Sequence, residues 1–346
     1  MATRKNQKVL NELIKDLKNK DFKYATKNEK EINWSSYNLA KINEINAYLL
    51  FVREAVDNAY VEITKAKGPG RPPTAACDLA KIVLVQIFFE VAERQAAGLA
   101  ELFKEKLNLE NEPSPRTIGR AYKRHDVQEI LGKVFEMTQE PIFNKEQSFS
   151  ADGTGLPLSI KQNYANDRDN QDKHAGYDKA MIMICNNFHI ATGFVHAKGT
   201  ANDCPLFAPV LEQTAKNFHA MDKFALDAGF ISRQNCNLIN NVGAIPYIYP
   251  KEGISINKKG LLSWNHMLMA LIDNPQEWLR EYHERSNVEC YNSSHKRRFT
   301  RPLLKHITVL RGVEAFAKII ATNIVMLTTA YFERRVKVKQ FDSSYF

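Results

Sequence analysis

Four residues in the C-terminal part of the chain have the types and the spacing of a phosphate-binding site beside a metal ion. They are Tyr282, Arg285, Glu289 and Lys296. In a helix that turns by about 100° per residue, their side chains fall within a sector of roughly 60°. An acid next to a tyrosine and two cations suits a phosphate backbone held beside a metal. An exposed helix with ordinary salt bridges would show the same pattern, and the periodicity alone favours that simpler interpretation.

Two aspartates at the ends of short apolar segments add acids to this set. Asp152 follows Ser-Phe-Ser-Ala and precedes Gly-Thr-Gly, and Asp227 follows Phe-Ala-Leu and precedes Ala-Gly-Phe. A carboxylate at the end of a buried strand costs free energy unless it is paired or binds a cation. Together with Glu289 these acids would form an all-oxygen site, which suits Mg²⁺ or Mn²⁺. Each aspartate taken alone is more simply explained as the cap of a turn or helix.

Taken together, these residues resemble the motifs of the DDE transposases of the bacterial and archaeal insertion-sequence type. The four residues between 282 and 296 match the Tyr-x2-Arg-x3-Glu-x6-Lys signature of one subgroup without a gap. Asp152-Gly-Thr resembles the first acidic motif of the family, and Asp227-Ala-Gly-Phe resembles the second. The resemblance covers roughly residues 148–335.

The resemblance implies an α/β fold of the RNase H-like type, in which a mixed sheet is flanked by helices. It implies that Asp152, Asp227 and Glu289 are the catalytic residues and the ligands of two divalent ions, Mg²⁺ or Mn²⁺. The implied reaction is DNA strand cleavage at the element ends, followed by transfer of the freed 3′-OH to target DNA. The partners would be the terminal repeats of the element and the target DNA, bound by a homodimer.

A basic track surrounds the helix of Glu289. In the family that the chain resembles, Tyr282, Arg285 and Lys296 contact the DNA end near the cleaved phosphate. Arg297 and Arg298 extend this track past the site, and residues 278–311 carry eight Lys and Arg against three Asp and Glu. The whole chain has 48 Lys and Arg against 39 Asp and Glu, a formal net charge of +9. This excess indicates a polyanionic partner, with nucleic acid as the first candidate.

Two other functions remain open at this point. One is a metal-dependent DNA nuclease on the same fold, which cuts DNA but does not join it. The other is a non-enzymatic DNA-binding derivative of such an enzyme. The presence of all three acids argues against the derivative, whereas the sequence does not separate a transposase from a nuclease.

The N-terminal part is predicted to be all-helical. Residues 1–66 form a basic helical region, with nine Lys and Arg against four Asp and Glu in the first 30 positions. A solvated surface helix is favoured there over an arm that grips DNA. Residues 67–73, KGPGRPP, form a Gly/Pro linker because two glycines and three prolines cannot continue a helix. Gly70-Arg71-Pro72 also resembles the core of an AT-hook, which places an arginine in the minor groove, but a plain linker is favoured.

Residues 74–147 are predicted to be a helical, helix-turn-helix-like DNA-binding region. Ser114 is a good N-cap, and Pro115 suits the first position of a helix. On that helix four cations would share one face, at relative positions i, i+4, i+7 and i+8. They are Arg116, Arg120, Lys123 and Arg124. A solvated basic face on a helical bundle is an equally good interpretation.

Residues 148–335 have the mixed pattern of an α/β domain. Segments 180–185 and 190–197, joined by Asn-Asn-Phe-His, predict a hairpin. A helix is expected to begin at Asn202 or Asp203, and a longer one near Asn274. Further short strands are expected at Lys-Phe-Ala-Leu and at Ala-Ile-Pro-Tyr-Ile. Residues 336–346 are predicted to be a basic, polar tail.

The chain has the features of a cytoplasmic protein, which would associate with the nucleoid when bound to DNA. Its five cysteines include no Cys-x-x-Cys pair, and the first 20 residues have no apolar core of a signal peptide. The apolar stretches near residues 87 and 325 are shorter than the roughly 20 residues that span a bilayer. They are therefore predicted to be buried core helices, with no membrane partner.

Overall fold

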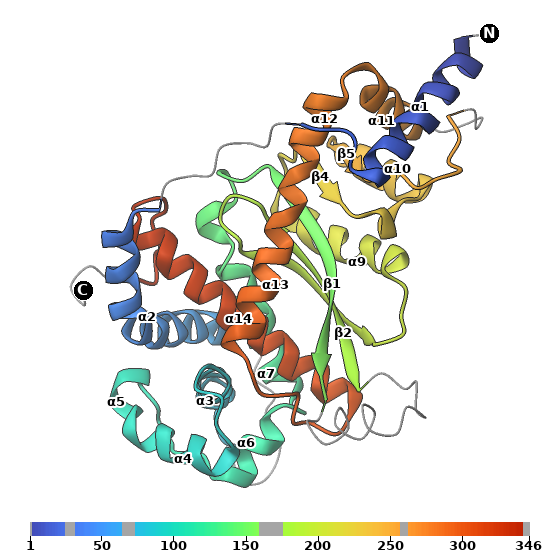
Figure 1. The fold of residues 1–346 in the computed structure, drawn as a ribbon. Helices are drawn as coiled ribbons and strands as arrows, with labels where there is room; N and C mark the ends of the chain where they lie inside the picture. Colours follow the sequence, from blue (N-terminus) through green and yellow to red (C-terminus); the bar gives the residue numbers. More distant parts are fainter. Residues whose placement is uncertain (1, 25–31, 64–72, 159–175, 257–261, 342–346) are drawn as a thin grey trace.

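The computed structural model describes residues 2–24, 32–63, 73–158, 176–256 and 262–341. The AT-hook-like Arg71, with residues 67–72 of the predicted linker, lies outside these ranges. Around a central sheet, helices cover both faces and a helical region lies to one side (Figure 1).

A mixed five-stranded sheet forms the centre of the C-terminal region, in the order β3-β2-β1-β4-β5. Its strands are β1 (Ser148–Pro157), β2 (Tyr177–Cys185), β3 (Ala191–Lys198), β4 (Lys223–Leu226) and β5 (Ile245–Ile248). β1, β2 and β3 pair antiparallel, whereas β4 pairs parallel with both β1 and β5. The predicted hairpin and the RNase H-like α/β fold class are confirmed.

The alternation of side chains along β1 assigns a different helix to each face of the sheet. Phe149 packs against Phe218, the residue that ends α9 (Asp203–Asn217), and Gly153 approaches Asp203 at the start of that helix. Ser150 and Asp152 point the other way, toward η3 (His283–Arg285) and α13 (Ser286–Arg298). Figure 1 shows α13 crossing one side of the sheet while α9 lies on the other.

The segment that carries Glu289 is a helix with a tighter turn inside it. α12 (Pro275–Tyr282) begins next to Asn274, as predicted, although it is shorter than expected. The Asn274 side chain caps it by accepting the N–H of Glu277 at 3.2 Å. η3 then forms one 3₁₀ turn before α13 begins. The prediction of a single regular helix from 282 to 296 is therefore wrong in detail. A 3₁₀ helix has about 3.0 residues per turn, and this changes the angles between the side chains.

Helices alone form the rest of the described N-terminal part. They are α1 (Ala2–Asn19), α2 (Trp34–Val61), α3 (Ala76–Phe88), α4 (Glu93–Leu102), α5 (Lys104–Leu107), α6 (Pro115–Ala121), α7 (His125–Met137) and η1 (Glu140–Ile142). α2 and α3 pack against the long helix α14 (Thr308–Phe332). α1 packs elsewhere, against α11 (Leu262–Asp273), and the Gln7 side chain donates to the backbone oxygen of Ile254 at 2.9 Å.

α14 is the one helix among the described residues with the length and apolar composition of a membrane span. However, 72% of its most apolar window is buried inside the fold. Its Asn323 side chain is fully buried and donates to the backbone oxygen of Ala191 at 2.8 Å, next to β3. The prediction of a core helix in this segment is confirmed.

The predicted basic face of residues 116–124 is wrong. α6 begins at Pro115 behind the Ser114 cap, as expected, but it ends at Ala121. The next residue, Tyr122, turns into the core and donates to Gln86 at 3.0 Å. Arg124 then starts α7 and forms an ion pair with Asp126 at 2.5 Å, so Lys123 and Arg124 do not continue the helix.

The predicted basic, polar tail packs on the fold in its described residues, 336–341, although Lys337 and Lys339 are exposed. Val336 and Val338 are each 5% exposed, and Phe341 is 6% exposed. The Phe341 ring contacts Phe51 of α2 and Tyr331 of α14. The three apolar side chains are buried against the fold, and burial of their apolar surface stabilises this position of the segment.

Trp264 is a core residue of α11, the helix that packs against α10 (Arg233–Asn241). Its side chain is 6% exposed, and its indole N–H donates to the Ser255 backbone oxygen at 2.9 Å. A buried indole with a satisfied N–H stabilises the fold through its large apolar area. Trp264 therefore serves packing in this structure.

Gly193→Ala is expected to lower the free energy of unfolding by about 1–3 kcal/mol. A Cβ on Gly193 of β3 would lie 2.5 Å from the backbone oxygen of Val210, so α9 would have to move off the sheet. Gly132→Ala is the matched control, because no described atom lies within 4 Å of its added Cβ in the middle of α7. The control is expected to gain about 0.5–1 kcal/mol from helix propensity. Urea unfolding measures both, and equal effects would contradict the close approach of α9 to β3.

Candidate active site

Asp152 in β1 and Asp227, which directly follows β4, lie next to each other on two neighbouring interior strands of the sheet. β4 runs parallel to β1 with Leu226 opposite Ala151, so each aspartate directly follows a paired residue. Asp227 ends β4 and caps η2 (Ala228–Phe230), with its Oδ1 accepting the N–H of Ala228 at 2.6 Å. The predicted strand-end position is confirmed for Asp227 but is wrong for Asp152, because β1 continues to Pro157 and Asp152 pairs with Ile182 of β2. The two acids meet where the parallel pairing of β1 with β4 ends, although they are far apart in the sequence.

The Asp152 carboxyl group is partly removed from water. Burial, the largest cause, acts with the nearby carboxylates of Asp203 and Asp227 and against the Gly153 N–H and the Arg285 charge, and together they raise the pKa of Asp152 from 3.8 to about 6. Its Oδ2 accepts a hydrogen bond from Nδ2 of Asn292 at 3.2 Å. A carboxyl group with a raised pKa beside further acids is a common feature of functional sites.

Arg285 lies among the acids. Burial alone would lower the pKa of its guanidinium, but Tyr282, Asp227, Glu289 and Asp152 together raise it. Both Nη atoms of Arg285 donate to Oε1 of Glu289, one helical turn further along. The Glu289 side chain is 54% exposed, whereas that of Arg285 is 21% exposed. The structure thus gathers the two aspartates, Arg285 and Glu289 around one place.

Glu289 is paired with a cation in this arrangement. Within the part of the chain that the structure describes, no three Asp, Glu, His or Cys side chains come close enough together to hold a metal ion. The three carboxylates still supply oxygen ligands only, which is the donor set that Mg²⁺ and Mn²⁺ prefer. The donor types therefore fit such an ion, and Glu289 is the one that would have to exchange its partner.

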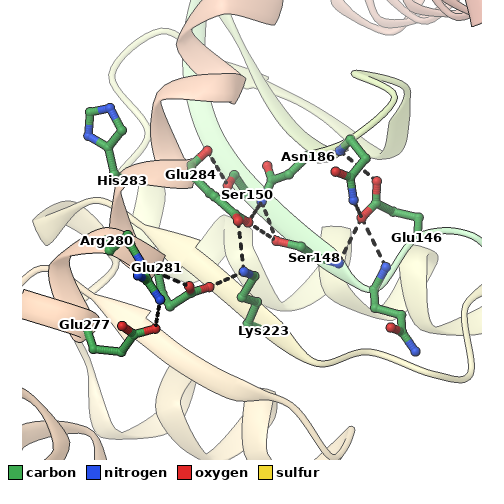
Figure 2. A network of polar contacts seen from close by, with 12 residues as sticks. Glu146, Ser148, Ser150, Asn186, Lys223, Glu277, Arg280, Glu281, His283 and Glu284 are labelled. Atoms are coloured by element: carbon green, nitrogen blue, oxygen red, sulfur yellow. Dashed lines mark hydrogen bonds and ion pairs between the residues drawn. The ribbon is translucent and has the colours of Figure 1, made fainter. Parts of the chain in front are cut away.

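A network of polar contacts fixes the segment that leads into α13 against the sheet (Figure 2). Glu284 of η3 accepts hydrogen bonds from Ser148 Oγ at 2.5 Å and from Lys223 Nζ at 2.9 Å. Lys223 also pairs with Glu281 of α12. Ser148 and Lys223 are the first residues of β1 and β4, so this contact connects η3 to the two strands that carry the aspartates.

Tyr282 is positioned by aromatic packing. Its ring stacks on that of Trp278 with 5.5 Å between centroids, and it lies 5.2 Å from the ring of Tyr249, which follows β5. Burial raises the pKa of its hydroxyl, so Tyr282 stays neutral and can donate a hydrogen bond. Its position near Arg285 agrees with the predicted grouping.

The other predicted DNA-binding residues differ in their surroundings. Lys296 and Arg297 are exposed on the last turn of α13, and Arg116 and Arg120 are exposed on α6. Arg298 instead pairs with Glu44 of α2 at 2.5 Å and lies over the Phe88 ring. Arg124 donates to the backbone oxygen of Thr74 at 2.6 Å in addition to its ion pair. These two arginines serve intramolecular contacts in this structure.

Comparison with known proteins supplies the family. A sequence model described as "Transposase DDE domain" matches residues 144–326, more than half of the chain. The chain belongs to the DDE transposase family. It is 27% identical over 254 residues to a probable transposase for insertion sequence element ISA1214 of Archaeoglobus fulgidus, covering 72% of this chain and 73% of that relative. No solved structure matches the chain.

Membership of this family makes the chain a transposase of the insertion-sequence type, with DNA as its partner and a divalent metal ion in its chemistry. The matched region begins just before β1 and ends within α14, so it includes both aspartates and the helix of Glu289.

Two features next to the site were missed by the sequence reasoning. Asn292 follows Glu289 by three positions, but a single asparagine in a polar helix gives no signal. Asp203 was recognised only as the start of a helix, and it forms an ion pair with Lys179 at 2.8 Å. A Cβ added to Gly153 would lie only 2.6 Å from Oδ1 of Asp203. The Gly153 after the first aspartate was the available sign, because glycine permits close approach.

Asp152→Asn is expected to stabilise the metal-free transposase at pH 7 by about 2 kcal/mol more than at pH 4. The folded-state pKa of about 6 lies above the ordinary 3.8, so the native state binds more protons between these values. The stabilising contribution of Asp152 to the free energy of unfolding is present below about pH 4 and is lost as the pH rises through about 6. An asparagine does not suffer this loss. Urea unfolding at both pH values measures it, with exposed Asp273→Asn as control, and a pH-independent effect would contradict the burial of a charged Asp152.

Proposed function

We propose that this transposase cleaves DNA strands at the ends of its element and joins the freed 3′-OH to target DNA, with Asp152, Asp227 and Glu289 as its catalytic carboxylates. The observation that carries the proposal is that Asp152 of β1 and Asp227, just after β4, meet the pair formed by Arg285 of η3 and Glu289 of α13 on the same face of the sheet. Three acids from three separate elements, with an arginine among them, suit phosphodiester chemistry better than a purely structural role.

The same three carboxylates would hold the divalent ions, which we propose are two Mg²⁺ or Mn²⁺. When bound, such ions activate the attacking oxygen and stabilise the leaving oxygen of an in-line displacement. The chain contributes the oxygen ligands, and the partial burial of Asp152 keeps water from screening its charge.

Arg285 has a direct role in this proposal. A guanidinium forms paired hydrogen bonds with a carboxylate or with a phosphate in the same geometry. A phosphate of the DNA end could therefore replace Glu289 on Arg285, and the carboxylate of Glu289 would then be free for a metal ion. Tyr282 would donate its hydroxyl proton to the same phosphate, and Lys296 would add a point charge further along α13.

The signature of Tyr282, Arg285, Glu289 and Lys296 supports assignment to the subgroup with this spacing. We further propose that the helices of residues 74–147 and the basic region of residues 1–66 bind DNA outside the site, through exposed cations such as Arg116, Arg120 and Lys123. The protein would act on DNA in the cytoplasm, as a homodimer that holds two element ends, and not at a membrane.

An assay with Mg²⁺, element-end DNA and a target plasmid tests the reaction. Joined products are expected if the protein is an active transposase. Cut ends without joined products would overturn the transfer step and leave a nuclease.

Asp152→Asn, Asp227→Asn and Glu289→Gln are each expected to reduce strand cleavage by at least about 10³-fold while DNA binding is largely retained. Each change removes a charge from the ligand set and nearly preserves the shape of the side chain. Glu212→Gln is the control, because Glu212 is exposed on α9, the helix on the opposite face of the sheet. Normal cleavage by any one of the three variants would remove that residue from the site.

Lys296→Ala is expected to weaken binding of element-end DNA and to make the slope of log K against log salt shallower by about one unit. The reason is that one phosphate contact, with its released counterion, would be lost. Lys216→Ala on α9 serves as the matched control, since Lys216 is an exposed lysine on the other side of the sheet. The measurement is a salt titration of DNA affinity, and an unchanged slope would show that Lys296 does not touch a phosphate.

A further inference from the structure

Asn292 is a polar residue on the buried side of α13. Its side chain is 7% exposed, and it lies among Val288, Tyr291 and His295, which form the buried face of the same helix. Asparagine is a poor helix former, and an apolar residue would pack better at such a position. The choice of an amide here therefore needs a reason other than stability.

One half of the Asn292 amide has a partner. Nδ2 donates a hydrogen bond to Oδ2 of Asp152 at 3.2 Å, and this bond spans 140 positions in the sequence. The bond places Asp152 under α13, one helical turn after Glu289. It therefore connects Asp152, the first acid, with the helix that carries the third acid.

The other half of the amide is unsatisfied. Among the described residues, Oδ1 of Asn292 has no hydrogen-bond partner, although it is buried. A buried acceptor without a partner costs about 1–3 kcal/mol. The opposite orientation of the amide would bring Oδ1 against the Asp152 carboxylate, so the donor is correctly assigned to Asp152. The Asn292 amide therefore forms one hydrogen bond to Asp152, at the cost of a buried Oδ1 without a partner.

We propose that Asn292 is a positioning residue of the active site, which holds the Asp152 carboxylate in the orientation that a divalent ion requires. The proposal rests on the proposed function of Asp152. Residues that orient metal ligands act through hydrogen bonds of this kind, and their loss typically weakens metal affinity or activity by about 10–100-fold.

The test uses full-length protein with the variants Asn292→Leu, Asn292→Gln and Ser293→Ala. Asn292→Leu removes the amide and keeps the volume, and Asn292→Gln keeps an amide donor. Ser293→Ala is the control, because it removes the polar group of an exposed neighbour on the same helix. Binding of Mn²⁺ alone is followed by electron paramagnetic resonance, and thermal unfolding is measured without metal.

Asn292→Leu is expected to be at least as stable as the wild type and to bind Mn²⁺ about tenfold or more weakly. Asn292→Gln should recover part of the affinity, and Ser293→Ala should leave it unchanged. A variant Asn292→Leu that binds Mn²⁺ as the wild type does would overturn the proposal, whether or not its stability falls, because Asn292 would then serve packing only.

Failure of this inference can be distinguished from failure of the proposed function. Asp152→Asn is measured beside the Asn292 variants. If Asp152→Asn loses Mn²⁺ binding and strand cleavage while Asn292→Leu retains both, only the role of Asn292 is wrong. If Asp152→Asn also binds Mn²⁺ and cleaves DNA normally, the proposed function of Asp152 is wrong, and the inference fails with it.

Discussion

The half-buried carboxylate of Glu284 holds the helix of the active site against the sheet. Its side chain and that of Lys223 are 19% and 17% exposed, so their ion pair is largely shielded from water. Burying two charges costs free energy that the attraction between them does not always recover, but losing one partner costs much more. Because Ser148 and Lys223 begin the two strands that lead to Asp152 and Asp227, this contact fixes where η3 crosses the sheet. The direction of α13, and with it the place of Glu289, follows from that crossing.

The acids further along these strands create the opposite problem. Burial raises the pKa of Asp152, the nearby charge of Asp227 adds to this rise, and Arg285 offsets part of it. The two networks are neighbours in the chain, since Glu284 faces the sheet and Arg285 faces the acids. Both residues lie in the 3₁₀ turn, where successive side chains point about 120° apart, so adjacent residues can serve the two networks. The clustered acids are therefore held in place by a neighbouring network in which the charges of Glu284 and Lys223 are paired.

Local signals were sufficient for much of the fold. Strand-end Asp227, the start of a helix near Asn274 and the hairpin around residue 187 each depend on residues within a few positions, and all three were predicted correctly. The predicted length of the helix after Asn274 was wrong, because α12 ends at Tyr282. Contacts between distant residues were not predicted. Lys223 meets Glu284 across 61 positions, and Arg298 meets Glu44 across 254. The run of cations after Glu289 assigned Arg298 to DNA, because the sequence does not show which cations already have a partner within the protein.

This distinction changes the meaning of the net charge of +9. A cation contributes to DNA binding only if its charge faces solvent and is not already paired. Of the cations at the end of α13, Lys296 and Arg297 are exposed, whereas Arg298 is bound to Glu44 of α2. The Arg298 pair connects the helical N-terminal part to the helix of Glu289, next to the packing of α2 on α14. The basic track thus divides into residues available to DNA and residues that hold the transposase together, and the boundary between them falls within one turn of α13.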